Sequence, residues 1–259
     1  MECKNCGNHF EGHFCNVCGQ SSAVGRLTLP GFLREVSESV FELNRGLLFT
    51  LKNLLVRPGH GIREFLEGKR VYYYKPVAYA LVLSTIYYLI TQIFDADTFM
   101  GDVVGGFQRG KRDAMEVEAG SQDIINDGHV FNWLIDNFSY SSLLVIPMYA
   151  LASYLVFRRK GHNYLEHMVL NAYVQGQHAL FYLSSVILGA MTNQIDLFVS
   201  IAFTLSILYR YWVFIQFYHT NKIVTVIVRL TFTYVIFFII LVLVLGLLAV
   251  IDGVMGDFY

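Results

Sequence analysis

Long apolar segments, separated by short charged ones, dominate the chain from residue 76 onward. The first covers 76–94 without an acidic or basic side chain. At about 1.5 Å per residue, a helix of this length nearly spans a hydrocarbon core of about 30 Å. Four further apolar segments follow. The pattern predicts an all-α polytopic membrane bundle of about five transmembrane helices, over 76–94, 140–157, 164–191, 195–218 and 223–251.

A different apolar pattern precedes the first span. Apolar residues recur every three or four positions over 28–56, as on one face of an amphipathic helix or a pair of such helices. The members are Leu29, Phe32, Val36, Val40, Leu43, Leu47, Leu51 and Leu54. Thr28 caps its start, the Arg57-Pro58-Gly59 sequence breaks it, and a shorter helix is expected over 61–67. Such a helix either lies on the membrane surface, where it recruits lipid or a partner, or packs on the ends of the bundle.

Aromatic and basic residues gather directly before the first span. Tyrosine rings at headgroup depth, with cations facing anionic lipid, are typical of an interfacial anchor. The predicted anchor consists of Lys69, Arg70, Tyr72, Tyr73, Tyr74 and Lys75. The chain is therefore expected to divide into an N-terminal unit at 1–22, interfacial helices at 26–75, and a bundle at 76–259 with an acidic outer loop at 95–139.

Composition supports a membrane protein. Of the 259 residues, 55% are hydrophobic and only 15% are charged, against about 25% charged in soluble domains. With 21 Phe, 17 Tyr and 4 Pro, the chain is too apolar to be disordered or collagen-like. A formal net charge of −1 gives no reason to expect a nucleic-acid partner.

The charges are distributed unequally between the two sides of the predicted spans. With the N-terminus inside, sixteen Lys and Arg and eight acidic residues lie inside, whereas three basic and twelve acidic residues lie outside. Because Lys and Arg in short loops are retained on the cytoplasmic side, this orientation is favoured. Five crossings then place the C-terminus outside.

Four cysteines in two pairs mark the N-terminal unit. Cys3 and Cys6 form one CxxC pair, Cys15 and Cys18 form the second, and a glycine follows each pair. About twenty residues cannot bury enough core to fold alone, and a bound metal would supply the missing free energy. The spacing predicts a zinc ribbon in which four thiolates complete the tetrahedron of a structural Zn²⁺.

Alternatives to zinc exist for these cysteines. Disulfides are disfavoured because the charge pattern places them in the reducing cytoplasm. Iron or a redox pair would also suit CxxC motifs. His9 and His13 lie between the pairs and could replace a cysteine, although four thiolates already complete a tetrahedral site.

The predicted third span carries a polar stripe. We give this name to His167, Asn171, Gln175, His178, Tyr182 and Ser185, which recur every three or four residues and so share one helix face. Unpaired polar groups in hydrocarbon cost several kcal/mol, so this face should point into the bundle or a wet cavity. Glu166 lies at the end of the stripe, and we expect its partner to be Arg210 or Arg229.

The polar stripe has two interpretations. It forms a path for protons, ions or polar substrates, or it supplies the hydrogen bonds that hold the helices together. A metal shared by His167 and His178 is excluded, because eleven residues of helix separate them by about 16 Å. Neither interpretation requires a catalytic residue.

Three sequence motifs carry a resemblance to a known family. They are CxNCG followed by FCxxCGQ, then FxLNRGLLFTLKNLLVRPGxGIREFLEGKR, then YYxKPVAYALVLST. The chain resembles DUF3667, a family of uncharacterised membrane proteins found mainly in Bacteroidota, and its architecture is also similar to the five-span Yip group. The resemblance implies a bacterial protein of the inner membrane, so that the C-terminus, placed outside by five crossings, would be periplasmic. The family name by itself does not imply any particular activity. The likeness to the Yip group implies a non-enzymatic scaffold or trafficking role.

No P-loop, nucleophile elbow, dinucleotide-binding glycine pattern or HExxH motif is present in the sequence. The leading hypothesis is a non-enzymatic membrane protein whose ribbon and surface helix dock a cytoplasmic protein partner or organise membrane lipid. The second is a transporter or channel that uses the polar stripe with Arg210 and Arg229. An intramembrane enzyme built on Glu166, His167 and His178 is the least favoured, because no complete catalytic constellation is visible.

Overall fold

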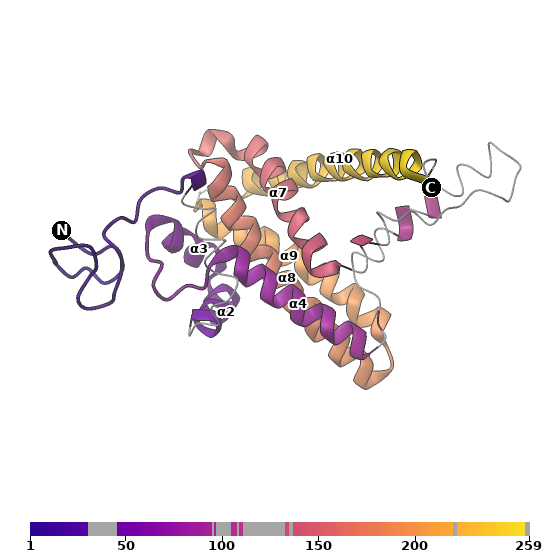
Figure 1. The fold of residues 1–259 in the computed structure, drawn as a ribbon, viewed down its shortest axis with the longest axis horizontal. Coiled ribbons are helices and arrows are strands. Elements are labelled where there is room, and N and C mark those ends of the chain that lie inside the picture. The colour runs from indigo at the N-terminus through magenta and orange to yellow at the C-terminus, as the bar shows by residue number, and fades with distance from the viewer. Residues whose placement is uncertain are drawn as a thin grey trace, which may run out of the picture.

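The computed structural model of the protein is helical apart from the N-terminal ribbon and the connections (Figure 1). It describes residues 1–30, 46–94, 96, 105–107, 109–110, 133–134, 137–219 and 222–256. Within these residues there is no β-strand, only two isolated bridges in the ribbon. The all-α fold class is therefore confirmed. Most of the expected acidic loop, 95–139, lies outside the described residues.

In the described part of the chain, the complete helices fall into two groups, short ones before residue 68 and long ones from residue 76 onward. The short helices are α2 (Gly46–Val56) and α3 (Pro58–Glu67). The long helices are α4 (Pro76–Ile93), α7 (Phe138–Phe157), α8 (Tyr164–Thr192), α9 (Ile195–Tyr218) and α10 (Ile223–Gly256). A single 3-10 turn, η1 (Arg158–Lys160), joins α7 to the loop before α8. In Figure 1, α10 extends from the bundle toward the C-terminus, whereas the ribbon lies at the opposite end.

The helix α8 is the centre of the bundle and packs against α4, α7 and α9. Its contact with α4 is close because Gly176 has no side chain. A Cβ at Gly176 would lie 2.5 Å from the ring of Tyr79. Tyr79, Leu170 and Tyr173 are buried in the same core cluster. The most polar of the long helices thus lies among the others.

Among the described residues, four helices are long and apolar enough to cross a membrane, namely α4, α7 with the turn that follows it, α9 and α10. The helix α8 does not belong to this set, although its 29 residues make it about 43 Å long. The polar stripe lowers its hydropathy. The sequence predicted about five transmembrane helices; four meet the requirement by length and composition, and the fifth is the helix that the others surround.

The helix α2 is the described end of the predicted helix over 28–56, whose residues 31–45 lie outside the described part. Leu47 and Leu51 pack against the core and Leu54 is fully buried, as expected for one apolar face. The other side is not polar, however, because Leu48 and Val56 are exposed. The described part is therefore apolar on two sides, which a membrane interface accommodates better than water does.

The break between α2 and α3 is shorter than expected. The helix α3 begins at Pro58, three residues before the predicted start, because proline fits the first helical position, where its missing N–H is not needed. It ends at Gly68, which has a φ of 115°. That left-handed conformation favours glycine and closes the helix.

The predicted interfacial anchor is wrong for two of its three tyrosines. Tyr73 and Tyr74 are buried, with 7% and 5% of their surface exposed. The hydroxyl of Tyr73 donates to Glu64 at 3.0 Å and also meets the Asn53 amide. These bonds fix Tyr73 inside the protein. Tyr72 remains exposed.

The cations of the predicted anchor are partly buried. The guanidinium of Arg70 lies over the ring of Phe65 and donates to the carbonyl of Gly25 at 3.2 Å. Arg70 therefore joins the helices to the segment that leads from the ribbon. Lys69 and Lys75 are half-buried, and the ammonium of Lys69 lies 3.9 Å from the Glu64 carboxylate. Tyr72 is therefore the member of the predicted anchor that is most open to contact with lipid.

Candidate metal centre and polar network

The four cysteines form one compact cluster. Their Sγ atoms all lie within 4.8 Å of one another, and the Cys3–Cys18 and Cys6–Cys15 separations are 3.5 and 3.6 Å. A tetrahedral ion with metal–sulfur bonds of about 2.3 Å needs sulfur atoms roughly 3.8 Å apart. All four thiols are free. The donor set and its spacing therefore fit a single metal ion.

Each cysteine pair lies in a turn of the same design, repeated after twelve residues. In the first turn, the Cys3 amide donates to the carbonyl of Asn8 at 2.9 Å, and the Gly7 amide donates to the carbonyl of Cys3 at 2.8 Å. The corresponding bonds in the second turn have the same lengths. Gly7 and Gly19 have φ values of 72° and 73°, a conformation that favours glycine.

The electrostatics of the cluster favour a cation. Burial raises the pKa of the Cys15 thiol, but the backbone amides of Cys18 and Val17 outweigh it and bring that pKa to about 6. The Asn8 amide lowers the pKa of the Cys6 thiol, whereas burial and the neighbouring thiols raise it to about 12. At neutral pH, the Cys6 thiol therefore loses its proton readily only when a metal ion replaces it.

The two histidines of the ribbon are not part of the cluster. His9 and His13 are exposed, and the group of potential ligands found among the described residues consists of cysteines alone. The ribbon instead meets the rest of the protein at the start of the α3–α4 connection. Lys4 and Asn5 of its first turn lie beside Lys69, and Gln20, at the end of its second turn, accepts a hydrogen bond from the Arg70 amide at 3.3 Å. One side of the metal centre thus faces the bundle.

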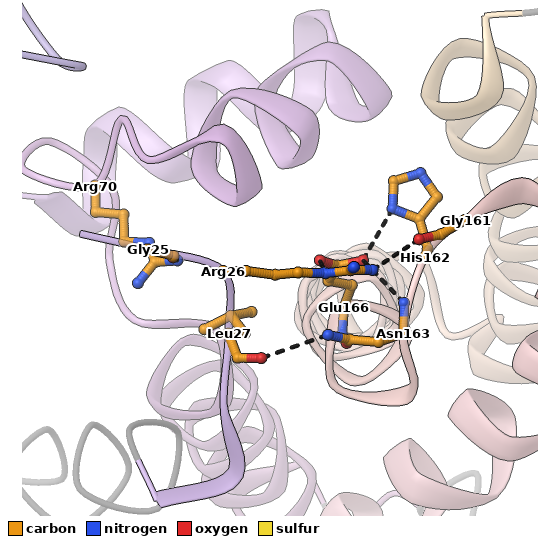
Figure 2. Close-up of polar contacts among 8 residues, drawn as sticks. All are labelled: Gly25, Arg26, Leu27, Arg70, Gly161, His162, Asn163 and Glu166. Carbon is orange, nitrogen blue, oxygen red and sulfur yellow. Dashed lines mark hydrogen bonds and ion pairs between the residues drawn. The ribbon is translucent and has the colours of Figure 1, made fainter.

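A linker arginine fixes the segment after the ribbon to the start of α8 (Figure 2). The Nε of Arg26 donates to Glu166 Oε1 at 2.8 Å, and its guanidinium also donates to the carbonyl of Gly161 at 2.7 Å. Arg210 and Arg229 were the expected partners of Glu166, and that expectation is wrong. Arg26 reaches the carboxylate from the surface, whereas Arg229 lies over the ring of Phe157, 6.0 Å from its centre.

Glu166 also organises the first turn of α8. The Asn163 side chain accepts a hydrogen bond from the backbone amide of Glu166 at 2.8 Å. The Glu166 carboxylate in turn accepts one from the backbone amide of Asn163 at 2.9 Å. This reciprocal capping satisfies two amides that a helix start leaves unpaired. His162 Nδ1 lies 3.2 Å from the same carboxylate, and the Asn163 side chain donates to the carbonyl of Leu27 at 3.4 Å. The linker and the helix start therefore form one connected unit.

The first half of the polar stripe is used in packing. His167 and Asn171 are buried, and both contact the hydroxyl of Ser153 on α7, at 2.9 and 3.1 Å. Asn171 accepts a hydrogen bond from Arg210 on α9 at 3.0 Å. The Arg210 guanidinium lies 3.7 Å from the ring centre of Tyr149. These contacts join α7, α8 and α9. They are interhelical hydrogen bonds of the kind that the packing interpretation of the polar stripe expects.

The second half of the polar stripe borders open space. Gln175, His178 and Tyr182 line a cavity of about 750 Å³, and Arg210 lines it from the neighbouring helix. Ser185 is buried and donates to the carbonyl of Tyr182 at 2.8 Å. The stripe therefore divides between a hydrogen-bonded half and a cavity-lining half.

Sequence reasoning missed three residues of this network. Arg26 stands in a polar linker, where nothing indicates a partner 140 positions away. Ser153 and Tyr149 lie in a predicted span as small or aromatic residues among apolar ones. Their spacing of four residues places them on one helix face, and this spacing could have indicated that they act together. No sequence pattern, however, indicates that this face packs against α8.

Comparison with known proteins gives one family. Residues 44–88 match the model of the family DUF3667, described as a protein of unknown function. The match confirms the resemblance to this family. It covers α2, α3 and part of α4, but neither the cysteine cluster nor the polar stripe. No curated protein matches the chain, and no solved structure matches it.

Replacing Cys15 with serine should abolish metal binding. We expect the purified full-length protein to carry about one metal ion per chain, since four thiolates fill a tetrahedral site, and Cys15→Ser to carry almost none. Elemental analysis by mass spectrometry measures both. Metal retention should also fall as the pH is lowered, because protons compete for the thiolates. His13→Ala is the matched control and should keep its metal; equal loss in this variant would contradict the assignment.

Replacing Arg26 with alanine should loosen the linker. The side chain of Arg26 is 60% exposed, and exposed ion pairs contribute about 0.2–1 kcal/mol. Hydrogen–deuterium exchange at residues 23–27 should therefore rise by up to about five-fold. Arg159→Ala, which removes a nearby exposed arginine, should leave this exchange unchanged. Identical exchange in the native protein and Arg26→Ala would show that the contact does not hold the linker.

Proposed function

We propose that the protein is a non-enzymatic, multi-pass membrane protein whose N-terminal zinc ribbon docks a protein partner at the membrane surface. One observation carries this proposal. The ribbon is attached to the bundle on one side, through its first turn, Gln20 and the linker, while its second turn exposes two large apolar side chains. These are Phe14 and Val17, with 66% and 67% of their surface exposed.

Zinc is the metal that this donor set suits best. Four thiolates with no histidine or carboxylate form a closed, soft site. A closed site leaves no position for substrate, so the metal acts in folding and not in catalysis. Iron would fit the same geometry, and elemental analysis distinguishes the two. When bound, zinc orders the turn that presents Phe14 and Val17.

The helix α2 supports a second contact, with membrane lipid. Its apolar residues Leu48, Phe49 and Val56 are exposed, and the ring centre of Phe49 lies 5.9 Å from that of the exposed Tyr72. Lys69 and Lys75 flank this tyrosine in the chain. An apolar helix beside a tyrosine and two cations suits the interface between headgroups and acyl chains. In this proposal, α2 holds the ribbon close to the bilayer.

The proposed orientation places the ribbon in the cytoplasm of a bacterium and the C-terminus in the periplasm, across the inner membrane. The excess of Lys and Arg on the ribbon side of the spans supports it. Free cysteines suit a reducing compartment. The number of crossings decides the position of the C-terminus, since five place it outside and four place it inside.

Transport remains a second candidate, and the cavity is the observation that favours it. Gln175, His178 and Tyr182 line this space together with Arg210, and polar or charged residues inside a bundle are typical of a substrate path. His167 and Asn171 are instead occupied by hydrogen bonds. A transport path would therefore use the second half of the stripe.

The docking role is tested by affinity capture of the tagged full-length protein from its membranes. Replacing Phe14 and Val17 together with serine should keep the metal and lose the partner, because the apolar contact area is removed. Replacing Cys3 and Cys6 with serine should lose both. Glu11→Ser, an exposed polar change on the same ribbon, is the control. A partner that stays bound at equal yield to the metal-free variant would count against this role.

Reporter fusions at both termini test the orientation. A fluorescent protein that matures in the cytoplasm should be bright at the N-terminus, and alkaline phosphatase, which needs its disulfides, should be active at the C-terminus. This outcome requires α8 to cross the membrane together with the four more apolar helices. A bright fluorescent protein at the C-terminus would mean four crossings and would overturn the proposed topology.

A further inference from the structure

A cavity of about 750 Å³ lies among α4, α7, α8, α9 and α10. This volume falls within the range of about 300–1,000 Å³ that is typical of small-molecule sites. Most of its wall is apolar or aromatic, with Ala179 from α8, Phe203 from α9 and Phe237 from α10 among the lining residues. An aqueous solute would find little to bind on such a wall, whereas a hydrocarbon chain would.

A few polar atoms converge on this apolar space. Ser84, Ser206 and Arg210 line the cavity, and each is at least nine-tenths buried. Within the described part of the chain, the two serine hydroxyls, Arg210 Nε and His178 Nε2 have no hydrogen-bond partner. Buried polar groups are normally paired. Four such atoms around one cavity therefore indicate a polar group that a ligand brings.

Arg210 determines the charge of that ligand. Only 1% of its surface is exposed, its hydrogen bond is to the neutral amide of Asn171, and its guanidinium carbon lies 3.7 and 5.9 Å from the ring centres of Tyr149 and Tyr234, which carry no charge. No described acidic residue forms an ion pair with it. A buried cation is stable only when its charge is compensated. The missing partner is an anion.

The mouth of the cavity shows where the ligand enters. Phe203, Val235, Phe238 and Ile239 line the cavity and are also strongly exposed, Phe238 by 64%. These residues belong to α9 and α10, two of the helices that are apolar enough to span a membrane. In a bilayer, their exposed side chains face acyl chains. Access to the cavity is therefore from the lipid phase.

We infer that the cavity binds an amphiphile with an acyl chain and an anionic head. The carboxylate or phosphate of the head pairs with Arg210 and accepts hydrogen bonds from Ser84 and Ser206. The chain lies along the apolar wall toward the mouth between α9 and α10. A fatty acid and a lysophospholipid share this chemistry. This site goes beyond the docking role of the ribbon and does not depend on it.

Binding of three oleyl probes to the full-length protein in neutral detergent tests the inference. Native mass spectrometry, which counts bound molecules, should show one oleate or one oleoyl lysophosphatidate per chain. Oleyl alcohol, which has the same chain without the charge, should bind at least ten-fold more weakly. The preferred head, carboxylate or phosphate, is the one that binds more tightly. Equal binding of all three probes would overturn the inference, because the cavity would then not select an anion.

Variants locate the binding to this cavity. Arg210→Gln should lower the affinity for the anionic probes at least ten-fold and leave oleyl alcohol unchanged, whereas Arg210→Lys, which keeps the charge, should retain most of it. Arg229→Gln is the matched control, because Arg229 does not line the cavity. Ser206→Leu fills the space without removing the charge and should weaken all three probes, which tests the site even where Arg210→Gln does not fold. Unchanged binding in both Arg210→Gln and Ser206→Leu would overturn the assignment.

Discussion

Every polar side chain that α8 carries into the bundle needs a partner there, and this requirement determines how the helices are arranged. Water is absent from a bilayer core, so an unpaired amide or imidazole cannot be left facing lipid. His167, through its Nδ1, and Asn171 meet this need by contacts with Ser153 on α7 and Arg210 on α9. Those bonds set the rotation of three helices about their axes, and that rotation directs the remaining polar residues of α8 toward the cavity.

The N-terminal ribbon depends on a different constraint. Its core consists of Cys3, Cys15, Cys18 and Phe10, which is too little apolar surface to maintain a fold. A metal ion at the cysteine cluster would therefore hold the two turns, which repeat after twelve residues, together as one rigid body. Because Arg26 and Arg70 tie the following linker to α8 and α3, the ribbon is held beside the bundle and does not move as a separate domain.

The sequence alone predicts those features that depend on the spacing of residues close together in the chain. Helix positions, the polar stripe and the cysteine cluster follow from spacing along a single element, and the all-α class and the DUF3667 resemblance were confirmed. Contacts between distant segments did not follow. Glu166 was expected to pair with Arg210 or Arg229, but Arg26 reaches it from 140 positions away, and no local pattern encodes that. Tyr73 and Tyr74 lie in an aromatic and basic segment that is typical of an interfacial anchor. Hydrogen bonds to α2 and α3 nevertheless hold them inside the protein.

The position of α8 between two sets of partners limits how its length can change. Its first turn is fixed to the linker by Glu166, its middle to α7 and α9 by Asn171, and its later turns face the cavity through His178. One inserted residue rotates all later positions by about 100°. An insertion between Asn171 and His178 would therefore turn the cavity-lining half of the stripe toward another helix while leaving the packed half in place. Only an insertion whose length is close to a whole number of helical turns keeps both halves of the stripe facing their present partners. The length of α8 is therefore constrained as strictly as its composition.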